Sequence, residues 1–191
     1  MDPPEERDPE LDQPTLVTPR LVLRPYQQED SDGLARLAGE RAIADTTISI
    51  PHPYTTATAR ARISDWQIDA ENRSAYHFAV CRAAAEGLIG GVELRAIDWE
   101  HLQGELSLWI GVTQQGRGYA GEALGELIGY GFEQLGLWRL YAYHMVRNPA
   151  SGRVLERVGM RREGVMRDRV CKWGRFEDVV MSAILRSEWH R

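Results

Sequence analysis

The sequence predicts an α/β fold in which a mixed, mostly antiparallel sheet of about seven strands packs against about four helices. Three strand patterns, at 76–82, 88–95 and 103–112, follow one another with no helix between them, which favours an antiparallel meander. A helical pattern then separates the third strand from another at 139–145, and two strands joined through a helix run parallel. The 191 residues suffice for one domain with a sizeable core but not comfortably for two.

The N-terminal segment 1–14 differs in composition from the rest of the chain. It holds four prolines and six acidic residues and almost no apolar side chains. Such a segment cannot offset the entropy lost on ordering. We therefore expect a disordered acidic tail at 1–14, followed by a single domain at 15–191.

The other elements follow from periodicity and from residues that end helices and strands. Pro25 ends a first strand that starts at Leu21, because proline has no N–H to donate. Asn148 as cap, Pro149 at the first helical position and Gly159 bracket a short helix. The remaining expected elements are a helix at 31–38, a loop rich in Thr, Pro and His through Thr56, a second helix at 58–73, a helix after a glycine-rich turn that ends at Gly136, and a final hairpin of strands at 160–166 and 176–185.

Composition excludes several classes of protein. A formal net charge of −5 gives no overall attraction for nucleic acid, and no apolar run approaches the ~18 residues that span a bilayer. The acidic, proline-rich start is unlike a secretory signal. Only Cys81 and Cys171 occur, which excludes a disulfide framework and leaves no zinc-ligand spacing. We expect a cytoplasmic protein with no metal, nucleic-acid or membrane partner.

The stretch from Gln115 to Gly121 lies between a strand pattern and a helical pattern. Its three glycines allow the backbone to approach a ligand closely, and the first N–H groups of the next helix have no internal partner. An anion is the natural occupant of such a turn. The sequence therefore predicts a ligand that carries phosphates.

Gly116, Gly118 and Gly121 also satisfy the G-x-G-x-x-G pattern of dinucleotide-binding proteins, which raises a nicotinamide or flavin enzyme as an alternative. That pattern calls for an acidic residue about 20 positions later, and none occurs after Glu133 up to the end of the next strand at Met145. A P-loop is excluded because no Gly-Lys-Ser/Thr follows the turn.

The hexad from Gln115 to Ala120 resembles the Q/R-x-x-G-x-G/A signature of the GNAT superfamily of acyl-CoA-dependent N-acyltransferases. Further landmarks, in order, resemble the branch that contains the ribosomal-protein-alanine N-terminal acetyltransferases, and the resemblance covers about 18–189. These landmarks are Arg20-Leu-Val-Leu-Arg24, Asn148-Pro-Ala-Ser151, Arg153-Val-Leu-Glu156, Gly159-Met160, Glu163-Gly164, Arg167, Gly174 and Asp178.

The resemblance implies a GNAT-like sheet whose two central strands splay apart, with acyl-CoA in the gap and its pyrophosphate on the turn. The strand before the turn would pair with the pantetheine arm. The implied cofactor-binding residues are Ile110, Gly111, Val112, Gln115, Gly116, Arg117, Gly118, Tyr119, Ala120, Asn148 and Arg153. For Asn148, a helix cap is an equally good interpretation, and both roles are compatible.

The resemblance also suggests catalytic residues. Many superfamily members protonate the thiolate with a tyrosine, but that position is Leu155 here; the branch instead has a serine, Ser151, for which a plain first-turn helix residue is the alternative. Some members carry a glutamate that deprotonates the amine at the place of Glu105, and Glu93 and His144 compete for this role. The glutamate proposed as base in the branch is replaced by Val170.

We therefore expect an acetyl-CoA-dependent N-acetyltransferase that acts on a primary amine of a small molecule or a peptide N-terminus. The acceptor pocket is expected from segment 45–54, the second helix and the final hairpin. Branch members often form dimers, so a homodimer is possible on the resemblance. A non-catalytic acyl-CoA-binding module on the same fold remains an alternative, and a nicotinamide enzyme is a more distant one.

Overall fold

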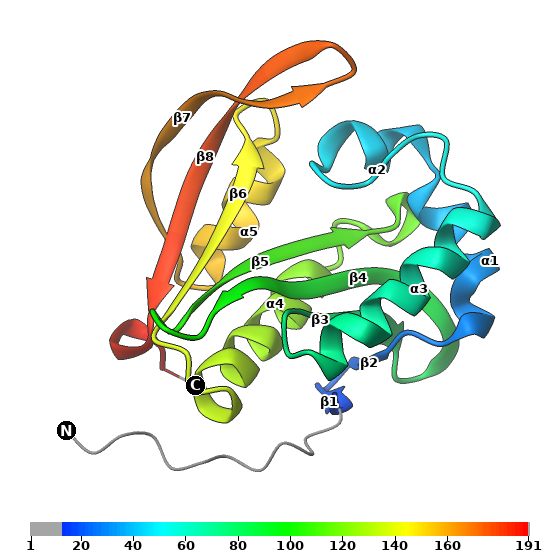
Figure 1. Ribbon diagram of the computed structural model, residues 1–191, viewed down its shortest axis with the longest axis horizontal. Helices are drawn as coiled ribbons and strands as arrows, with labels where there is room; N and C mark the ends of the chain where they lie inside the picture. The colour runs from blue at the N-terminus through cyan, green and yellow to red at the C-terminus, as the bar shows by residue number, and fades with distance from the viewer. Residues whose placement is uncertain (1–12, 191) are drawn as a thin grey trace.

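The computed structural model describes residues 13–190; residues 1–12, most of the expected tail, and residue 191 lie outside the described residues. Within 13–190, one mixed sheet holds eight strands in the order β1-β2-β3-β4-β5-β6-β8-β7 (Figure 1). The strands are β1 Leu16–Val17, β2 Leu21–Pro25, β3 Tyr76–Arg82, β4 Ala85–Asp98, β5 Gln103–Ile110, β6 Arg139–Met145, β7 Arg161–Lys172 and β8 Arg175–Leu185. The predicted fold class is confirmed, with one strand more than expected.

The β5–β6 pair is the parallel pair of this sheet, and every other neighbouring pair is antiparallel. Its pairing covers Gln103–Leu106 against residues 139–142 and then stops. Beyond Leu106 the two strands diverge, and Figure 1 shows the opening between them. The splayed pair that the family resemblance implied is therefore present.

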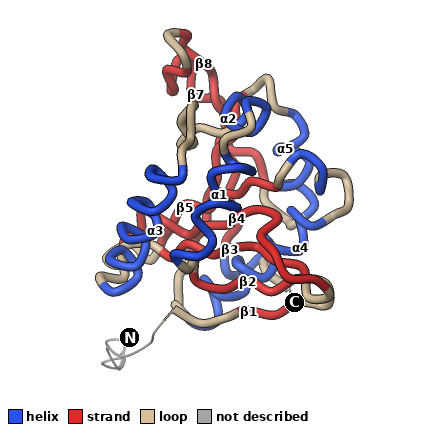
Figure 2. The backbone as a smooth tube through the Cα atoms, turned by 90° about the vertical axis from the view of Figure 1, so that its right-hand side faces the viewer, coloured by secondary structure: helices blue, strands red, loops and turns tan. Residues whose placement is uncertain are grey.

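Five α-helices cover the two faces of the sheet within the described part of the chain, where about four were expected. They are α1 Ser31–Ala38, α2 Arg41–Thr46, α3 Thr56–Glu71, α4 Tyr119–Gly129 and α5 Pro149–Arg157. Figure 2 shows α1 and α3 on one side of the strands, with α4 and α5 on the other. Leu124, Leu127 and Ile128 of α4 are fully buried in the main core, and Ile63 of α3 is fully buried in a second cluster.

The expected loop through Thr56 is wrong in part, because helix α2 lies inside it. Six residues are too few for a helical apolar period to show in sequence, and contacts from distant residues fix α2 instead. The Arg147 guanidinium donates to the carbonyl of Asp45 at 2.8 Å and reaches its carboxylate at 3.1 Å. The strand predicted at 103–112 is β5, and it ends earlier than expected, at Ile110. A short 3₁₀ turn, Val112–Gln114, follows it and continues into the glycine turn.

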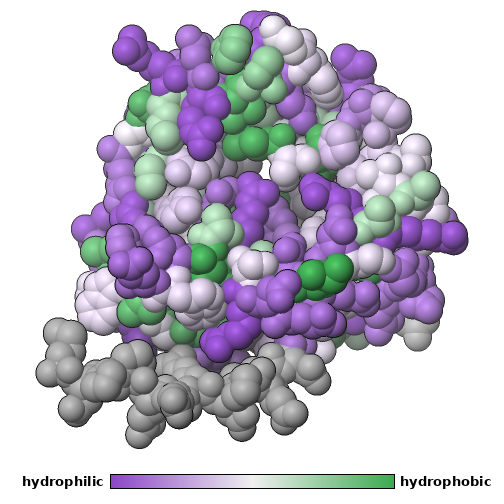
Figure 3. Space-filling model, in the orientation of Figure 1, coloured by the Kyte–Doolittle hydropathy of each residue, from purple (hydrophilic) through white to green (hydrophobic). Residues whose placement is uncertain are grey.

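The face in Figure 3 is largely hydrophilic, and its hydrophobic side chains gather mainly in the upper part, toward the β7–β8 hairpin. No helix between residues 13 and 190 combines the length and the apolar character needed to cross a membrane.

Candidate active site

The glycine turn adopts a backbone that side chains other than glycine rarely take. Gly116 has φ 75° and Gly118, the N-cap of α4, has φ 81°. These positive φ values carry little cost for glycine and let the chain reverse into α4. The side-chain amide of Gln115 donates to the carbonyl of Ile110 at 2.9 Å and so ties the turn to the end of β5.

Arg20, just before β2, supports the turn from outside. Its Nε donates to Glu122 Oε2 at 2.6 Å, and its Nη1 donates to the carbonyl of Arg117 at 3.0 Å. The guanidinium also lies 5.0 Å from the ring centroid of Tyr119. The sequence analysis identified Arg20 only as part of a motif that resembles the family. Its supporting role could not be predicted, because its partners Glu122 and Arg117 lie about 100 positions later in the chain.

A cavity of about 490 Å³, here called the cofactor cavity, is bounded by the end of β5, the glycine turn with the start of α4, and helices α2 and α5. Of the predicted cofactor-binding residues, it is lined by Ile110, Gln115, Gly116, Gly118, Tyr119, Ala120, Asn148 and Arg153. Gly111, Val112 and Arg117 adjoin this set in sequence but do not line the cavity. Ser151 also lines it, which brings most of the predicted site together.

The lining suits an acyl-CoA. The start of α4 presents N–H groups to one end of the cavity, and Arg153 and Arg157 of α5 add positive charge, so that end suits phosphates. Gln114, which sequence reasoning missed, lines the cavity with a buried Oε1 that has no hydrogen-bond partner within residues 13–190. A ligand N–H or O–H would satisfy that oxygen.

Asn148 and Ser151 form a small hydrogen-bonded unit at the start of α5. Asn148 Nδ2 donates to Ser151 Oγ at 2.9 Å, and Asn148 Oδ1 accepts from the Ser151 backbone N–H at 3.3 Å. Nδ2 also lies within 3.2 Å of the carbonyl of Thr46, at the end of α2. Asn148 therefore caps α5 as the sequence indicated, and it also joins α5 to α2 across the cofactor cavity.

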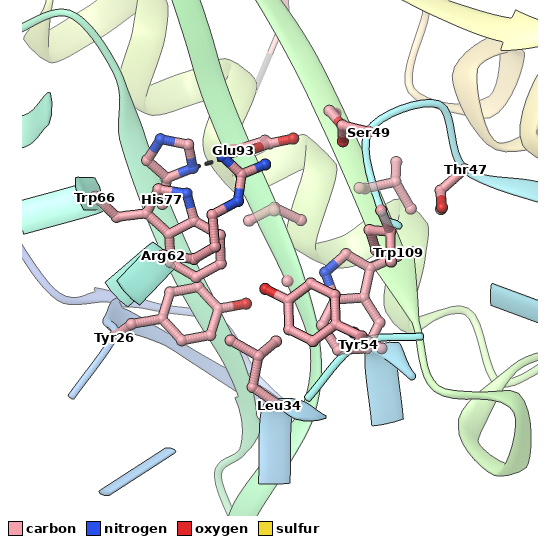
Figure 4. Close-up of a pocket in the computed structure, with 16 residues that line it drawn as sticks. Tyr26, Leu34, Thr47, Ser49, Tyr54, Arg62, Trp66, His77, Glu93 and Trp109 are labelled. Atoms are coloured by element: carbon pink, nitrogen blue, oxygen red, sulfur yellow. Dashed lines mark ion pairs between the residues drawn. The ribbon is translucent and has the colours of Figure 1, made fainter. Parts of the chain in front are cut away.

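A second, smaller cavity of about 40 Å³, here called the acceptor cavity, lies on the α1–α3 face of the sheet (Figure 4). Thr47, Leu108 and Trp109 line both cavities, so the two meet at the splayed end of β5. The acceptor cavity has aromatic walls and few charged groups. The labelled residues that line it are Tyr26, Leu34, Thr47, Ser49, Tyr54, Arg62, Trp66, His77, Glu93 and Trp109.

Glu93 of β4 is the carboxylate of the acceptor cavity. Strand register places it beside His77, whose Nδ1 lies 2.9 Å from Glu93 Oε2, and Arg95 Nη1 lies 3.3 Å from Oε1. Burial alone would raise the pKa of Glu93, but the contact with His77 and the charge of Arg95 outweigh it and lower the pKa to about 2. Glu93 is therefore a fixed negative charge at neutral pH.

His77 is buried beneath Trp66, which stacks on its ring at a centroid distance of 5.0 Å. Its Nε2 lies 3.2 Å from Asp69 Oδ2, on α3. The ring thus sits between two carboxylates, Asp69 toward the surface and Glu93 toward the cavity. This packing fits a structural role for His77, which also lines the acceptor cavity.

Other predicted site residues lie away from both cavities. Glu105, the expected base, pairs with Arg95 Nη2 at 2.6 Å and lines neither cavity. His144 packs beneath Gly152 of α5, and burial lowers its pKa. Leu155 is buried in the main core rather than in the cofactor cavity.

Residues of segment 45–54 and of the second helix, two of the three segments from which an acceptor pocket was predicted, line the acceptor cavity, but the final hairpin does not. No residue of β7 or β8 lines it within the described chain. The hairpin acts indirectly, because Lys172 Nζ donates to the carbonyl of Ile50 at 2.8 Å and so holds the loop that forms one wall.

Comparison with known proteins agrees with this geometry. Residues 20–161 match the family model described as "Acetyltransferase (GNAT) domain". The chain is 30% identical to an "Uncharacterized N-acetyltransferase p20" of Bacillus licheniformis over 180 residues, 92% of this chain and 98% of the relative. It is 34% identical to a "[Ribosomal protein uS5]-alanine N-acetyltransferase" of Escherichia coli over 80 residues, 42% of this chain and 41% of the relative.

A solved structure supplies a further comparison. The spermidine N-acetyltransferase from Vibrio cholerae, solved in complex with CoA and spermine, superimposes with a TM-score of 0.79 at 26% identity. The match covers 90% of this chain and 98% of the other. A dinucleotide enzyme is no longer needed to explain the glycine turn.

Proposed function

The chain belongs to the GNAT acetyltransferase family and is an N-acetyltransferase, and we propose that it transfers the acetyl group of acetyl-CoA directly to a primary amine in the acceptor cavity. The observation that carries the proposal is the junction of the two cavities at Thr47, Leu108 and Trp109. A thioester in the cofactor cavity and an amine in the acceptor cavity would meet there.

Acetyl-CoA supplies a thioester whose carbonyl carbon accepts the lone pair of the amine, after which the CoA thiol leaves. The chain must orient the amine, stabilise the negative charge that develops on the carbonyl oxygen, and return a proton to the sulfur. Backbone N–H groups on the unpaired edge of β5, beyond Leu106, are the proposed donors to that oxygen. Each well-aimed donor contributes about 3 kcal/mol of barrier lowering.

Ser151 is the proposed proton donor near the thiolate, because its hydroxyl lines the cofactor cavity and is oriented by Asn148. Glu93 is the proposed anchor of the amine. With a pKa of about 2, Glu93 is too weak a base to hold the proton of an alkylammonium ion, whose pKa lies several units higher, so it binds the ammonium form. The amine becomes neutral by equilibration with the buffered solvent before its lone pair attacks the thioester. We assign Glu105 a positioning role through Arg95, which contacts both carboxylates.

The proposed cofactor-binding set is the one that the resemblance implied, with Gln114 and Arg157 added because both line the cofactor cavity. Gly111, Val112 and Arg117 stay in the proposal as backbone neighbours of the lining residues. Support comes from the positive φ values of the turn and from the unpartnered Gln114 Oε1.

The first test is thermal unfolding with acetyl-CoA, succinyl-CoA, CoA or NADH, followed by CoA-thiol release with a panel of amines. A ligand at about 100 times its Kd adds about 2.7 kcal/mol, which shifts Tm by roughly 5 to 10 °C for a domain of this size. We expect shifts with the CoA compounds and release of CoA with at least one amine. A shift without release would favour the non-catalytic acyl-CoA module.

We also propose, on the resemblance, a cytoplasmic homodimer. The described part of the chain is consistent with this, since both cysteines are free and Phe176 on the hairpin is 67% exposed. Light scattering of the wild type and of Phe176→Ser tests the dimer, and a monomer in both would remove it.

A further inference from the structure

The acceptor cavity holds two opposite charges that are not paired with each other. Glu93 comes from β4 and Arg62 from α3, and Figure 4 shows the Arg62 side chain running past the ring of Trp66, with its guanidinium on the side of the cavity where Glu93 and His77 lie. Among the described residues that line the cavity, Glu93 is the one acidic side chain and Arg62 the one arginine.

The two charges differ in what already surrounds them. Glu93 is flanked by His77 and Arg95, at 2.9 and 3.3 Å. By contrast, none of the ion pairs formed between residues 13 and 190 includes Arg62. The neighbour of its guanidinium is the Tyr54 hydroxyl: burial raises the pKa of Tyr54, and the positive charge of Arg62 opposes that rise.

This arrangement has a consequence for the acceptor. An ammonium group beside Glu93 enters a cavity that already contains the positive charge of Arg62, and like charges at close range oppose binding. An acceptor that also carries an anion would cancel the charge of Arg62. Guanidinium is suited to this because its planar N–H groups match carboxylate and phosphate oxygens two at a time.

The walls of the cavity limit the rest of the acceptor. Tyr26 and Trp66 lie 4.7 Å apart between ring centroids, and Trp109 forms the side toward the cofactor cavity. Aromatic side chains of this kind bury flat or apolar groups. A linear polyamine would need further carboxylates for its other ammonium groups, and the described lining offers none beyond Glu93.

We propose that Arg62 forms an anion subsite, and that the acceptor is a small amine which carries a carboxylate or phosphate close by, because the cavity measures only about 40 Å³. Free α-amino acids and their conjugates belong to this class, whereas polyamines do not. The inference rests on the proposed function, since it assumes that the amine binds at Glu93. It adds the part of the acceptor that Arg62 recognises.

The test measures binding and turnover separately, with CoA or acetyl-CoA present. Alanine, alaninamide and ethylamine form a small series in which only the first has the anion, and O-phosphoethanolamine against ethanolamine tests phosphate. We expect the wild type to bind alanine at least about 10-fold more tightly than its amide, because a guanidinium–carboxylate hydrogen bond is charge-assisted. Preference for O-phosphoethanolamine over ethanolamine would assign phosphate rather than carboxylate.

Arg62→Gln should abolish the preference for the anionic acceptor, and Arg62→Lys should keep part of it. Arg60→Gln is the matched control, because Arg60 is exposed on the same helix and does not line the cavity; it should leave the preference intact. Equal affinity of the wild type within both pairs, alanine with alaninamide and O-phosphoethanolamine with ethanolamine, or an unchanged preference in Arg62→Gln, overturns the subsite. An anion preference in binding without release of CoA from any acceptor contradicts the proposed catalysis and leaves the subsite supported.

Discussion

Asn148 and Ser151 are joined by two hydrogen bonds that run in opposite directions. The side-chain amide of Asn148 donates to the hydroxyl of Ser151, and its carbonyl oxygen accepts from the backbone of the same residue. The cap that begins α5 thereby also orients the hydroxyl that faces the cofactor cavity. A single residue couples the stability of a helix to the placement of the proposed proton donor.

Substitutions at these two positions should separate the two effects. Ser151→Ala should lower kcat far more than it raises KM for acetyl-CoA, because the hydroxyl is proposed to act on the leaving thiolate. Asn148→Asp keeps an acceptor for the cap but cannot donate to Ser151, so it should lower kcat with little loss of stability. Asn148→Ala should lower kcat and also lower the free energy of unfolding, by about 1 kcal/mol, because it removes the helix cap. Steady-state kinetics and urea unfolding test this set, and an unchanged kcat in Ser151→Ala would remove Ser151 from the mechanism.

The pH dependence of activity should report the amine and not Glu93. The pKa of Glu93 is lowered to about 2, so this group is ionised throughout the range in which the enzyme is assayed. On the acid side kcat/KM should fall as the amine becomes protonated, and the midpoint should move with the pKa of the acceptor used. Profiles with two amines of different pKa check this. A midpoint that stays fixed near pH 4.5 with both amines would show that a carboxylate titrates instead.

Glu93 should also stabilise the fold in a pH-dependent way. Its pKa falls from an ordinary 4.5 to about 2 on folding, so its contribution is complete above pH 4.5 and is lost as pH falls through 2. The shift corresponds to about 3 kcal/mol as an upper value. Between pH 7 and pH 2, the wild type should lose more stability than Glu93→Gln, as measured by denaturant unfolding. Parallel curves for the two proteins would contradict the pairing with His77 and Arg95.

The three glycines of the turn should respond differently to alanine. Gly116 and Gly118 have positive φ, and a Cβ on Gly118 would lie 3.3 Å from Arg20 Nη2, so alanine at either should cost about 1 to 2 kcal/mol. Gly121 lies inside α4 with open space around its Cα, and alanine there should stabilise the helix by up to about 1 kcal/mol. Thermal unfolding without ligand measures all three. Equal effects would mean that the turn does not depend on backbone conformation.

Sequence patterns predicted the elements whose periodicity is long and the turn whose glycines are closely spaced. The strand–turn–helix unit from Gln103–Ile110 to α4 is the clearest case, because alternation, glycines and helical spacing all occur within a short stretch. Helix α2 and the two-residue strand β1 were not predicted. Each is too short to have a period of its own, and distant contacts stabilise them, such as Arg147 on Asp45.

The acceptor cavity could not be predicted because it depends on strand register. His77 and Glu93 are neighbours because β3 pairs with β4 in the register that places these two residues opposite each other. Arg62 reaches the cavity from α3, which packs on β3. The spacing of these residues in the chain does not indicate that they lie close together. The glycine turn, by contrast, is formed by consecutive residues and could be predicted from them.

The short parallel ladder between β5 and β6 also has a consequence for how the protein opens. Within the sheet of residues 13–190, only four residues on each strand pair the β1–β5 half with the half that contains β6, β8 and β7, and the rest of that edge of β5 is unpaired. Outside the sheet, single hydrogen bonds such as that from Lys172 to the carbonyl of Ile50 also connect the halves. In hydrogen-exchange experiments these halves should therefore appear as separate cooperative units in the free protein. A bound acyl-CoA would contact both halves where β5 and β6 diverge. In the protein saturated with acyl-CoA, the two halves should therefore exchange hydrogen as one cooperative unit.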